Sequence, residues 1–450
     1  MKFRKTVRTA LRGLVPLVGL VLLTGPLVGQ TSEPLRIEIT EGVIEPLPFA
    51  VARFVTTDAG AGDIAADIAQ VIASDLEGSG LFREIPRNAH IATVTNINSP
   101  VIYKDWKAIN AEILITGSLE LVGDGDIRIS FRLHDVFSNK DLGQGVRFTS
   151  RPDVWRRVAH QVADIVYERT TGEKGYFDTQ IAFVAESGEK TSRTKRLAVM
   201  DHDGANLRYI PTRSNLVLAP RWSPNNRHIL FTSLEDGRPS ANRIDIGTGE
   251  VDRLWSSDTI MSFSPRFSPQ GDGILLSLIE RGNTDIYAID LRTGATRRLT
   301  SSPAIDTAPS ASPDGRQIVF ESDRSGSQQL YIMPADGGTP PQRISFGAGR
   351  YGTPVWSPRG DYIAFTKQWR GNFHIGVMRT DGTEERLLSR SYLDEGPAWS
   401  PNGRVLIFFR EPRGANAGPS LFTVDLTGRN LRQLRTPEFA SDPSWSRLRQ

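Results

Sequence analysis

Few residues in this sequence have the types and spacing that catalysis requires. No serine has glycine both two positions before it and two positions after it, so the nucleophile elbow of the hydrolases is missing. The sequence also lacks a Walker phosphate loop, a G-x-G-x-x-G that leads from a strand into a helix and an H-E-x-x-H zinc motif. Its six histidines lack metal-ligand spacing, and it has no cysteine. We therefore predict a protein that is not an enzyme and uses no metal or cofactor.

Two acidic segments could bind a cation or transfer protons. Residues Asp201-His202-Asp203-Gly204 resemble a calcium loop for four positions, but the rest of the loop pattern is absent. We interpret them as an ordinary turn. Asp394 and Glu395 could form a catalytic pair, but adjacent acids in a loop are more often solvated, and this is our interpretation here.

A repeat of about 45 residues predicts the architecture that must position any site. The string Pro-x-aromatic-Ser-Pro recurs, with Ala311 in the aromatic slot of the third copy and a truncated sixth copy. Its serines are Ser223, Ser268, Ser312, Ser357, Ser400 and Ser446. This period fits four short antiparallel strands and their turns, which form one blade of a β-propeller. A single blade cannot bury its apolar face, so the blades are expected to close into a ring.

The two ends of the repeat array are offset. Residues 181–183, 197–200 and 208–209 match the second, third and fourth strands of a blade, but no first strand precedes them. The truncated copy at residues 443–446 supplies that strand from the C-terminus. We therefore predict six blades, the last assembled from both ends, which removes exposed edge strands.

The repeat also separates structural residues from functional candidates. We interpret Trp222, Trp356, Trp399 and Trp445 as packing between blades, since they occupy one fixed position of the repeat. The loops that precede each motif should emerge at the same end of the ring, where a rigid scaffold can present binding residues. They are residues 212–219, 256–264, 300–308, 345–353, 388–396 and 436–442.

The N-terminus is typical of a secretory signal peptide. A basic head at residues 2–12 precedes the apolar run 14–23, and we expect cleavage near Gly29. Removing residues 1–29 takes five of the 54 basic residues and leaves 49 against 51 acidic ones. The basic isoelectric point thus belongs largely to the signal, so charge does not favour a nucleic-acid partner. The mature chain is expected to be extracytoplasmic and to lack a transmembrane segment.

Residues 30–172 lack the repeat and predict a small α/β domain. Strands are expected at 48–55, 111–122 and 127–136, the last two joined by the hairpin turn Gly123-Asp124-Gly125-Asp126. Apolar residues at helical spacing predict helices at 63–78 and 153–169. The predicted fold is thus an α/β N-terminal domain followed by an all-β six-bladed propeller over 173–450, closed by the C-terminal strand.

With these features the chain resembles the TolB family of periplasmic Tol-Pal proteins. Residues Lys174-Gly175-Tyr176-Phe177 look like the family's domain junction, and Tyr392-Leu393-Asp394-Glu395-Gly396-Pro397 resembles its fifth-loop motif. The resemblance covers the signal peptide, the small domain and the propeller. It implies a non-enzymatic periplasmic adaptor that supports outer-membrane integrity and envelope constriction during cell division.

The resemblance implies two protein partners, the lipoprotein Pal and the inner-membrane protein TolA, and possible contacts with other envelope proteins. Pal would bind the propeller mouth, where Ala308 replaces an acidic residue of the family and Met261 a histidine. The implied Pal-binding residues are Met261, Asp306, Thr307, Ala308, Arg350, Asp394 and Glu395.

TolA would bind the N-terminal segment, in which Glu38 and Thr40 depart from the family pattern. Its residues are Leu35, Arg36, Ile37, Glu38, Ile39, Thr40, Glu41 and Gly42. The segment alternates apolar and polar residues, so it could add as a strand to a partner sheet or be the first strand of the small domain.

Two other functions compete with this interpretation. Related propellers accompany prolyl-peptidase-type hydrolases, but that class needs a hydrolase domain with a nucleophile elbow, which this sequence lacks. A receptor that binds a small ligand or a glycan in the central channel is the second alternative.

Overall fold

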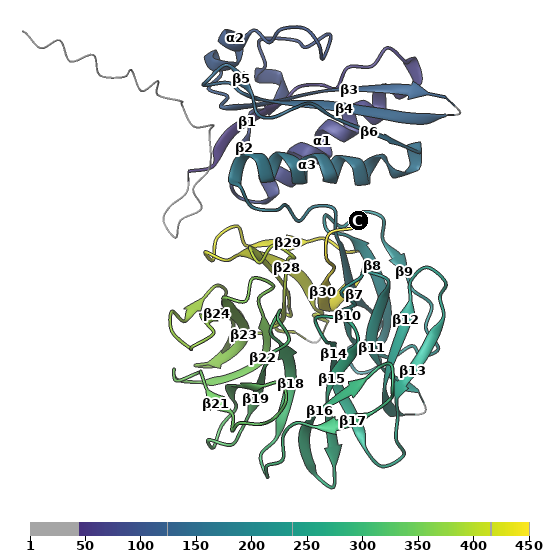
Figure 1. Cartoon of the computed structure of the whole chain (residues 1–450), viewed down its shortest axis with the longest axis vertical. Helices are drawn as coiled ribbons and strands as arrows, with labels where there is room; N and C mark the ends of the chain where they lie inside the picture. The colour runs from purple at the N-terminus through teal and green to yellow at the C-terminus, as the bar shows by residue number, and fades with distance from the viewer. Residues whose placement is uncertain (1–44, 124, 236, 415, 450) are drawn as a thin grey trace, which may run out of the picture. The chain divides into compact units, whose positions relative to one another are not determined.

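The computed structural model describes residues 45–449 except residues 124, 236 and 415. The predicted signal peptide and the segment Leu35–Gly42 lie outside the described residues. The described chain forms an N-terminal domain, with one mixed sheet and helices, followed by six four-stranded sheets (Figure 1). The predicted fold class is therefore confirmed. No helix in the described part is long and apolar enough to span a membrane.

The N-terminal sheet has the strand order β2-β1-β3-β4-β5, and β6 also pairs with β4. Strand β1 is parallel to β2 and β3, whereas β3 and β4 form an antiparallel hairpin. The strands are β1 (Leu47–Val51), β2 (Phe82–Glu84), β3 (Ile113–Val122), β4 (Asp126–Asp135), β5 (Lys140–Asp141) and β6 (Val146–Ser150). The helices are α1 (Gly62–Gly78), α2 (Tyr103–Ala108) and α3 (Trp155–Thr171), with single 3-10 turns η1 (Ala59–Ala61), η2 (Arg87–Ala89) and η3 (Pro152–Val154).

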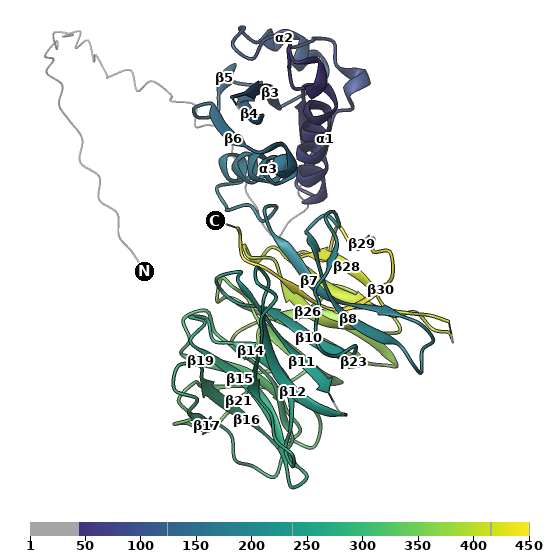
Figure 2. The same cartoon turned by 90° about the vertical axis from the view of Figure 1, so that its right-hand side faces the viewer.

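Helices α1 and α3 pack side by side against one face of this sheet (Figure 2). Their apolar stripes, such as Ile68 and Ile72 of α1 and Val162 of α3, join the largest buried cluster. The predicted helices at 63–78 and 153–169 are confirmed, but the second begins later because Pro152–Val154 forms a 3-10 turn. Helix α3 ends at Gly172, whose φ of 75° suits glycine and lets its N–H bond the Glu168 carbonyl.

Each of the first five propeller blades is an antiparallel sheet whose strands follow one another along the chain. The first blade has β10 (Val217–Trp222), β11 (His228–Glu235), β12 (Arg238–Asp245) and β13 (Val251–Trp255), and the second has β14 (Met261–Phe267), β15 (Gly273–Glu280), β16 (Asn283–Asp290) and β17 (Thr296–Arg298). The third has β18 (Asp306–Ala311), β19 (Gln317–Ser322), β20 (Gln329–Pro334) and β21 (Gln342–Arg343), and the fourth has β22 (Arg350–Trp356), β23 (Tyr362–Trp369), β24 (Asn372–Arg379) and β25 (Arg386–Leu387). The fifth has β26 (Asp394–Trp399), β27 (Val405–Arg410), β28 (Ser420–Asp425) and β29 (Arg432–Leu434).

The sixth blade is assembled from both ends of the repeat array, as predicted. Its strands, in the order β30-β7-β8-β9, are β30 (Phe439–Trp445), β7 (Gln180–Ser187), β8 (Thr194–Asp201) and β9 (Arg208–Tyr209). Figure 1 shows β30, in yellow, beside β7, in teal. At the end of β30 the Trp445 Nε1–H donates to Thr179 Oγ1 at 2.8 Å, and beyond it the Arg449 guanidinium pairs with Asp178 at 2.7 Å. Closure therefore combines backbone pairing with side-chain contacts.

Every inner strand contains one bulge, directly before the proline of the repeat. At this position the pairing register shifts and φ is positive, between 45° and 65°. The six residues are Ala219, Ser264, Ala308, Thr353, Gly396 and Asp442. The bulge lets the strand continue past a proline that cannot donate a ladder hydrogen bond. The segments predicted as loops are therefore partly strand, and that part of the interpretation is wrong.

The repeated tryptophans join neighbouring blades. Trp222, Trp356 and Trp399 are buried, and the Trp399 indole N–H donates to the Val355 carbonyl of the preceding blade at 3.1 Å. The Trp356 backbone N–H donates across blades to the Ser310 hydroxyl. These contacts agree with the predicted packing role.

Polar contacts also join the N-terminal domain to turns of the propeller. Asn430, in the β28–β29 turn, donates to the Gly78 carbonyl at 2.7 Å. Arg404 pairs at 2.6 Å with Glu173, which directly follows the N-terminal domain. Asp75 of α1 accepts from His202, which lies in the turn after β8.

Deleting residues 440–450 should lower the melting temperature by about 10 °C or more, because it removes β30 and reopens the ring. The measurement is thermal unfolding followed by circular dichroism. Adding a synthetic peptide of residues 436–450 should restore part of the lost temperature, since the peptide can pair with β7. An unchanged melting temperature in the truncated chain would contradict closure by β30.

Candidate functional site at the propeller mouth

We define the mouth as the end of the ring at which the six inner strands begin. Large apolar side chains are exposed there on five consecutive blades. They are Leu216 at 40%, Met261 at 45%, Ile305 at 50%, Phe346 at 71% and Tyr392 at 47% exposure. Each lies at the start of an inner strand or in the connection leading into it. Exposed apolar residues gathered at one place are typical of a protein-binding surface.

Two of the predicted site residues form buried ion pairs below this surface. The carboxylates of Asp306 and Asp394 are fully buried, and each accepts two hydrogen bonds from an arginine. Arg324 pairs with Asp306 at 2.8 Å, and Arg410 pairs with Asp394 at 2.7 Å. The Asp394 pair is bidentate, through Nε and Nη2 of Arg410, which fixes its geometry as well as its charge. The interpretation of Asp394 as a solvated loop acid is therefore wrong.

A cluster of three carboxylates, which we call the acidic cluster, lies on the channel side of the mouth. Its members are Glu321, Glu395 and Asp442. Glu321 reaches the next blade and accepts the Thr353 backbone N–H at 2.8 Å. A side chain at Gly352 would collide with Glu321, because an added Cβ would lie 2.6 Å from its carboxylate.

Two members of the acidic cluster, Glu395 and Glu321, have raised pKa values. Burial, and next the charges of Asp442 and Glu321, raise the pKa of Glu395 to about 7. Burial also raises the pKa of Glu321, although the Thr307 hydroxyl and the Thr353 N–H bond to it. A basic group of a partner placed here would relieve this repulsion.

A pocket of about 320 Å³ brings two predicted site residues together. Thr307 and Arg350 both line it, with Ile305 and Glu321. The Thr307 hydroxyl donates to Glu321 at 2.5 Å. Ala308 is buried at its bulge, so it offers little side-chain surface to a partner.

All seven predicted mouth residues thus lie in the first halves of the inner strands β14, β18, β22 and β26. Sequence reasoning missed Glu321, Arg324 and Arg410, which come from second strands or the residues after them. It also missed Phe346. One signal was available, because Leu216 and Ile305, like Met261, stand seven residues before a repeated serine.

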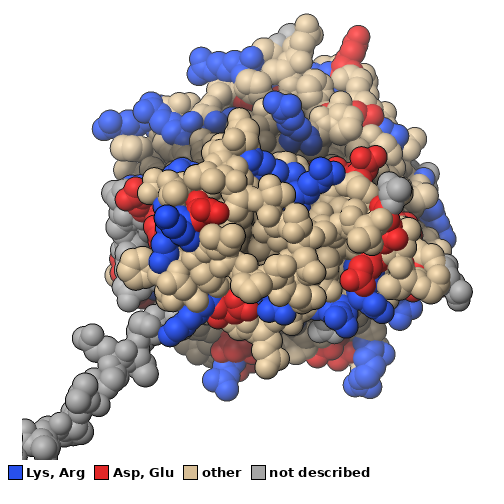
Figure 3. Space-filling view, turned by 90° about the horizontal axis from the view of Figure 1, so that it is seen from above, with Lys and Arg blue, Asp and Glu red and all other residues tan. Residues whose placement is uncertain are grey.

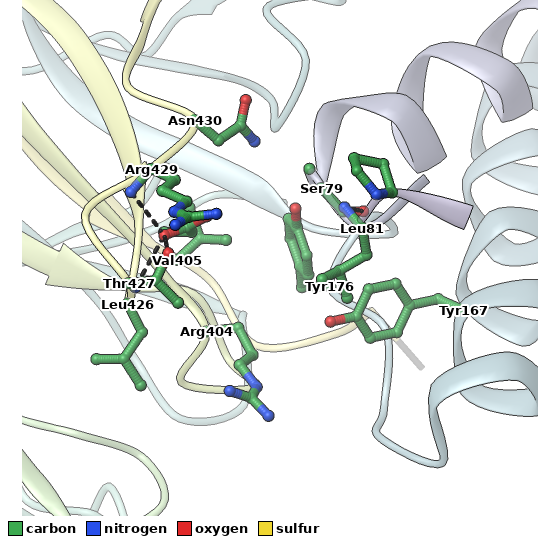
Figure 4. Close-up of a pocket in the computed structure, with 13 residues that line it drawn as sticks. Ser79, Leu81, Tyr167, Tyr176, Arg404, Val405, Leu426, Thr427, Arg429 and Asn430 are labelled. Atoms are coloured by element: carbon green, nitrogen blue, oxygen red, sulfur yellow. Dashed lines mark hydrogen bonds between the residues drawn. The ribbon is translucent and has the colours of Figure 1, made fainter. Parts of the chain in front are cut away.

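A second hollow lies between the N-terminal domain and the fifth blade (Figure 4). It measures about 370 Å³, and Tyr167 and Tyr176 lie across from Arg404 and Leu426. Burial raises the pKa of both tyrosine hydroxyls above the ordinary value. Both side chains therefore stay neutral near pH 7, and their rings pack edge to face with centroids 6.1 Å apart.

One group in the described chain has the composition of a metal site. Asp75, His160 and His202 place one ligand atom each within 4.8 Å of one another. The carboxylate of Asp75 already bonds both imidazoles, at 2.6 Å to His160 and 3.0 Å to His202. Spacing could not reveal this group, since α1, α3 and the turn after β8 supply one residue each. The prediction that Asp201–Gly204 forms an ordinary turn is confirmed. In addition, His202 of this turn contacts Asp75 of the N-terminal domain.

Charged side chains of both signs are interspersed over the face seen in Figure 3. No extended basic surface of the kind that tracks a nucleic-acid backbone is visible on that face.

Comparison with known proteins assigns both parts of the chain. Residues 35–142 match the TolB amino-terminal domain, and residues 167–449 match the TolB beta propeller domain. The chain is 57% identical over 448 residues to the Tol-Pal system protein TolB of Roseobacter denitrificans, covering all of both chains. It is 58% identical over 443 residues to the protein of that name from Cereibacter sphaeroides, covering 98% of this chain and 99% of that one. The crystal structure of TolB from Acinetobacter baumannii superposes with a TM-score of 0.79 at 26% identity, over 90% of this chain and 97% of that chain.

The titration of Glu395 gives a prediction for stability. Its carboxyl has a pKa of about 7 in the folded chain, against about 4.3 unfolded. A raised folded pKa contributes stability below about pH 4.3, and this stability is lost as the pH rises through about 7. We expect Glu395→Gln to remove this loss and to be more stable than the parent at pH 8, by on the order of 3 kcal/mol.

The measurement is urea unfolding between pH 5 and pH 8. Glu250→Gln, at an exposed position, is the matched control and should follow the parent. Parallel pH profiles for Glu395→Gln and the parent would refute the raised pKa.

Proposed function

The chain belongs to the TolB family of Tol-Pal system proteins, and from this membership we propose that it is a non-enzymatic adaptor acting in the periplasm. We propose that residues 1–29 are a signal peptide, that residues 30–172 form the small domain and that residues 173–450 form the propeller. The adaptor would link Pal to TolA, and through them support outer-membrane integrity and envelope constriction during cell division.

We place the Pal-binding surface at the mouth. The observation that carries this proposal is the series of exposed apolar residues on five consecutive blades. Aromatic side chains such as Phe346 and Tyr392 supply large contact areas and are frequent energetic centres of protein interfaces. The inner strands beneath them are rigid, since each is anchored by its bulge and by both neighbouring blades.

The charge at the centre of the mouth defines what Pal must present. The raised pKa values of Glu395 and Glu321 show that their ionised forms are unfavourable until a positive partner approaches. Asp306 and Asp394 already have such partners in Arg324 and Arg410. A lysine or arginine of Pal at the acidic cluster, ringed by apolar contacts, would fit this surface. Thr307 and Arg350 would then contact Pal directly, and Asp306 and Asp394 would hold the strands that carry them.

The TolA-binding surface is proposed for the N-terminal segment Leu35–Gly42. Its alternation of apolar and polar residues suits addition to an exposed sheet edge of the partner. Main-chain hydrogen bonds would then supply affinity, and Ile37 and Ile39 would supply side-chain contacts on one face.

Replacing both Phe346 and Tyr392 by alanine should weaken Pal binding at least about 10-fold, because each aromatic hot spot contributes about 1–2 kcal/mol or more. The measurement is isothermal titration with purified Pal. Phe137→Ala is the matched control, since Phe137 is 79% exposed on the N-terminal domain. Equal affinities for the parent and the double variant would place Pal elsewhere.

Charge reversal at Asp306 is a poor probe of this surface, because it would place a buried positive charge against Arg324 and destabilise the blade. Thr307→Trp tests the same position without breaking the ion pair, and it should also weaken Pal binding.

Deleting residues 35–42 should abolish TolA binding and leave Pal binding to the propeller in place. Pull-downs with purified TolA and with Pal measure both in parallel. Retained TolA binding would refute the role of this segment without affecting the proposal for the mouth.

A further inference from the structure

The axial channel contains a second, chemically different site at the end opposite the mouth. Past its bulge, each inner strand directs one repeat position into a cavity of about 670 Å³. This position is the residue between the proline and the aromatic of the repeat. Its occupants around the ring are Ser444, Arg221, Arg266, Ser310, Val355 and Ala398, and all six line the cavity.

The polar members of this set are contiguous. Inner strands of neighbouring blades contact one another in the order β30, β10, β14, β18, so the sequence around the ring is Ser444, Arg221, Arg266, Ser310. The other two positions, Val355 and Ala398, are apolar. Two guanidiniums flanked by two hydroxyls therefore occupy one side of the channel, and we call these four residues the basic arc.

The basic arc lacks a compensating negative charge. None of the residues that line the cavity is acidic, and Lys174 and Arg447 add two further basic residues at its edge. The Arg266 guanidinium has no hydrogen bond or ion pair with any described residue. Arg221 donates to its neighbouring Pro220 carbonyl at 2.7 Å and is influenced at longer range by Asp442.

Burial and the like charge of the neighbouring arginine both disfavour the protonated form of the Arg266 guanidinium. Burial, and next the charge of Arg221, hold the pKa of Arg266 well below its ordinary value. Arginine nevertheless stays protonated in proteins. The two guanidiniums therefore remain positively charged inside the ring without a counter-ion among the described residues, which is energetically unfavourable. A bound anion would offset this free-energy cost.

The two serines complete a donor set for such an anion. Ser444 Oγ accepts the Trp222 N–H and Ser310 Oγ accepts the Trp356 N–H, both at 3.1 Å. Neither hydroxyl donates to another described residue, so each hydrogen is free to point into the channel. Planar guanidiniums and hydroxyls together match the oxygen atoms of a carboxylate or a phosphate.

We propose that the basic arc binds an oxyanion, a carboxylate or phosphate group, inside the channel at the end opposite the mouth. The ligand would bridge Arg221 and Arg266 and accept from the hydroxyls of Ser310 and Ser444. This site is separate from the proposed Pal surface and does not depend on it.

The test uses thermal unfolding of the mature chain in a low-anion buffer, with inorganic phosphate or citrate added against sodium chloride of equal ionic strength. An oxyanion that binds the folded chain should raise the melting temperature by about 5 °C when it exceeds its dissociation constant about 100-fold. The cavity is lined by Trp222, Trp356, Trp399 and Trp445, so tryptophan emission should change with the same saturation curve.

Arg266→Gln should abolish both responses. In the low-anion buffer this variant should melt at or above the parent temperature, because it removes an unpaired positive charge that lies beside Arg221 in the channel. Arg281→Gln is the matched control, since the Arg281 side chain is 92% exposed at the β15–β16 turn. It should keep both responses.

The two added anions distinguish the sources of the group. A response to phosphate alone identifies a phosphate ligand, a response to citrate alone identifies a carboxylate ligand, and either supports the site when Arg266→Gln removes it. Equal responses in the parent and in Arg266→Gln, or a response to chloride as large as to either oxyanion, would overturn the proposal.

Discussion

Pairing of β30 with β7 is the interaction on which the rest of the propeller depends. Five blades follow one another along the chain, but the sixth exists only when residues 439–445 return to residues 180–187. The same contact continues into the linker, where Thr179 and Asp178 accept from Trp445 and Arg449. Because α3 leads directly into this linker, ring closure also fixes where the N-terminal domain begins its contacts with the blades.

The bulge in each inner strand divides the channel into two chemically different halves. Residues before the bulge reach the mouth, and residues after it line the far cavity. Five of the six bulge residues are not glycine, so the ring accepts strain of about 1–2 kcal/mol at each of them. Neighbouring blades compensate this in part, because Glu321 and Asp442 accept the N–H groups of Thr353 and Ala219.

The sequence predicted the ring and its closure because these follow from a repeat that can be counted. It predicted the position of the mouth for the same reason. It did not predict that Asp394 is buried, since the partner Arg410 lies on another strand and pairs with it only in the folded blade. The meeting of His160 and His202 at Asp75 depends in the same way on contacts between distant elements. The inner strand also extends beyond the predicted loop boundary, because a bulge before proline leaves no distinctive residue type in the sequence.

The acidic cluster and the basic arc give the channel opposite charge at its two ends. Glu321, Glu395 and Asp442 lie at the mouth, and Arg221 and Arg266 lie beyond the bulges. Asp442 acts on both groups, since its charge raises the pKa of Glu395 and opposes the lowering of the pKa of Arg221. The acidic end therefore favours a cation and the basic end favours an oxyanion, and Asp442 is a carboxylate whose charge acts on both groups.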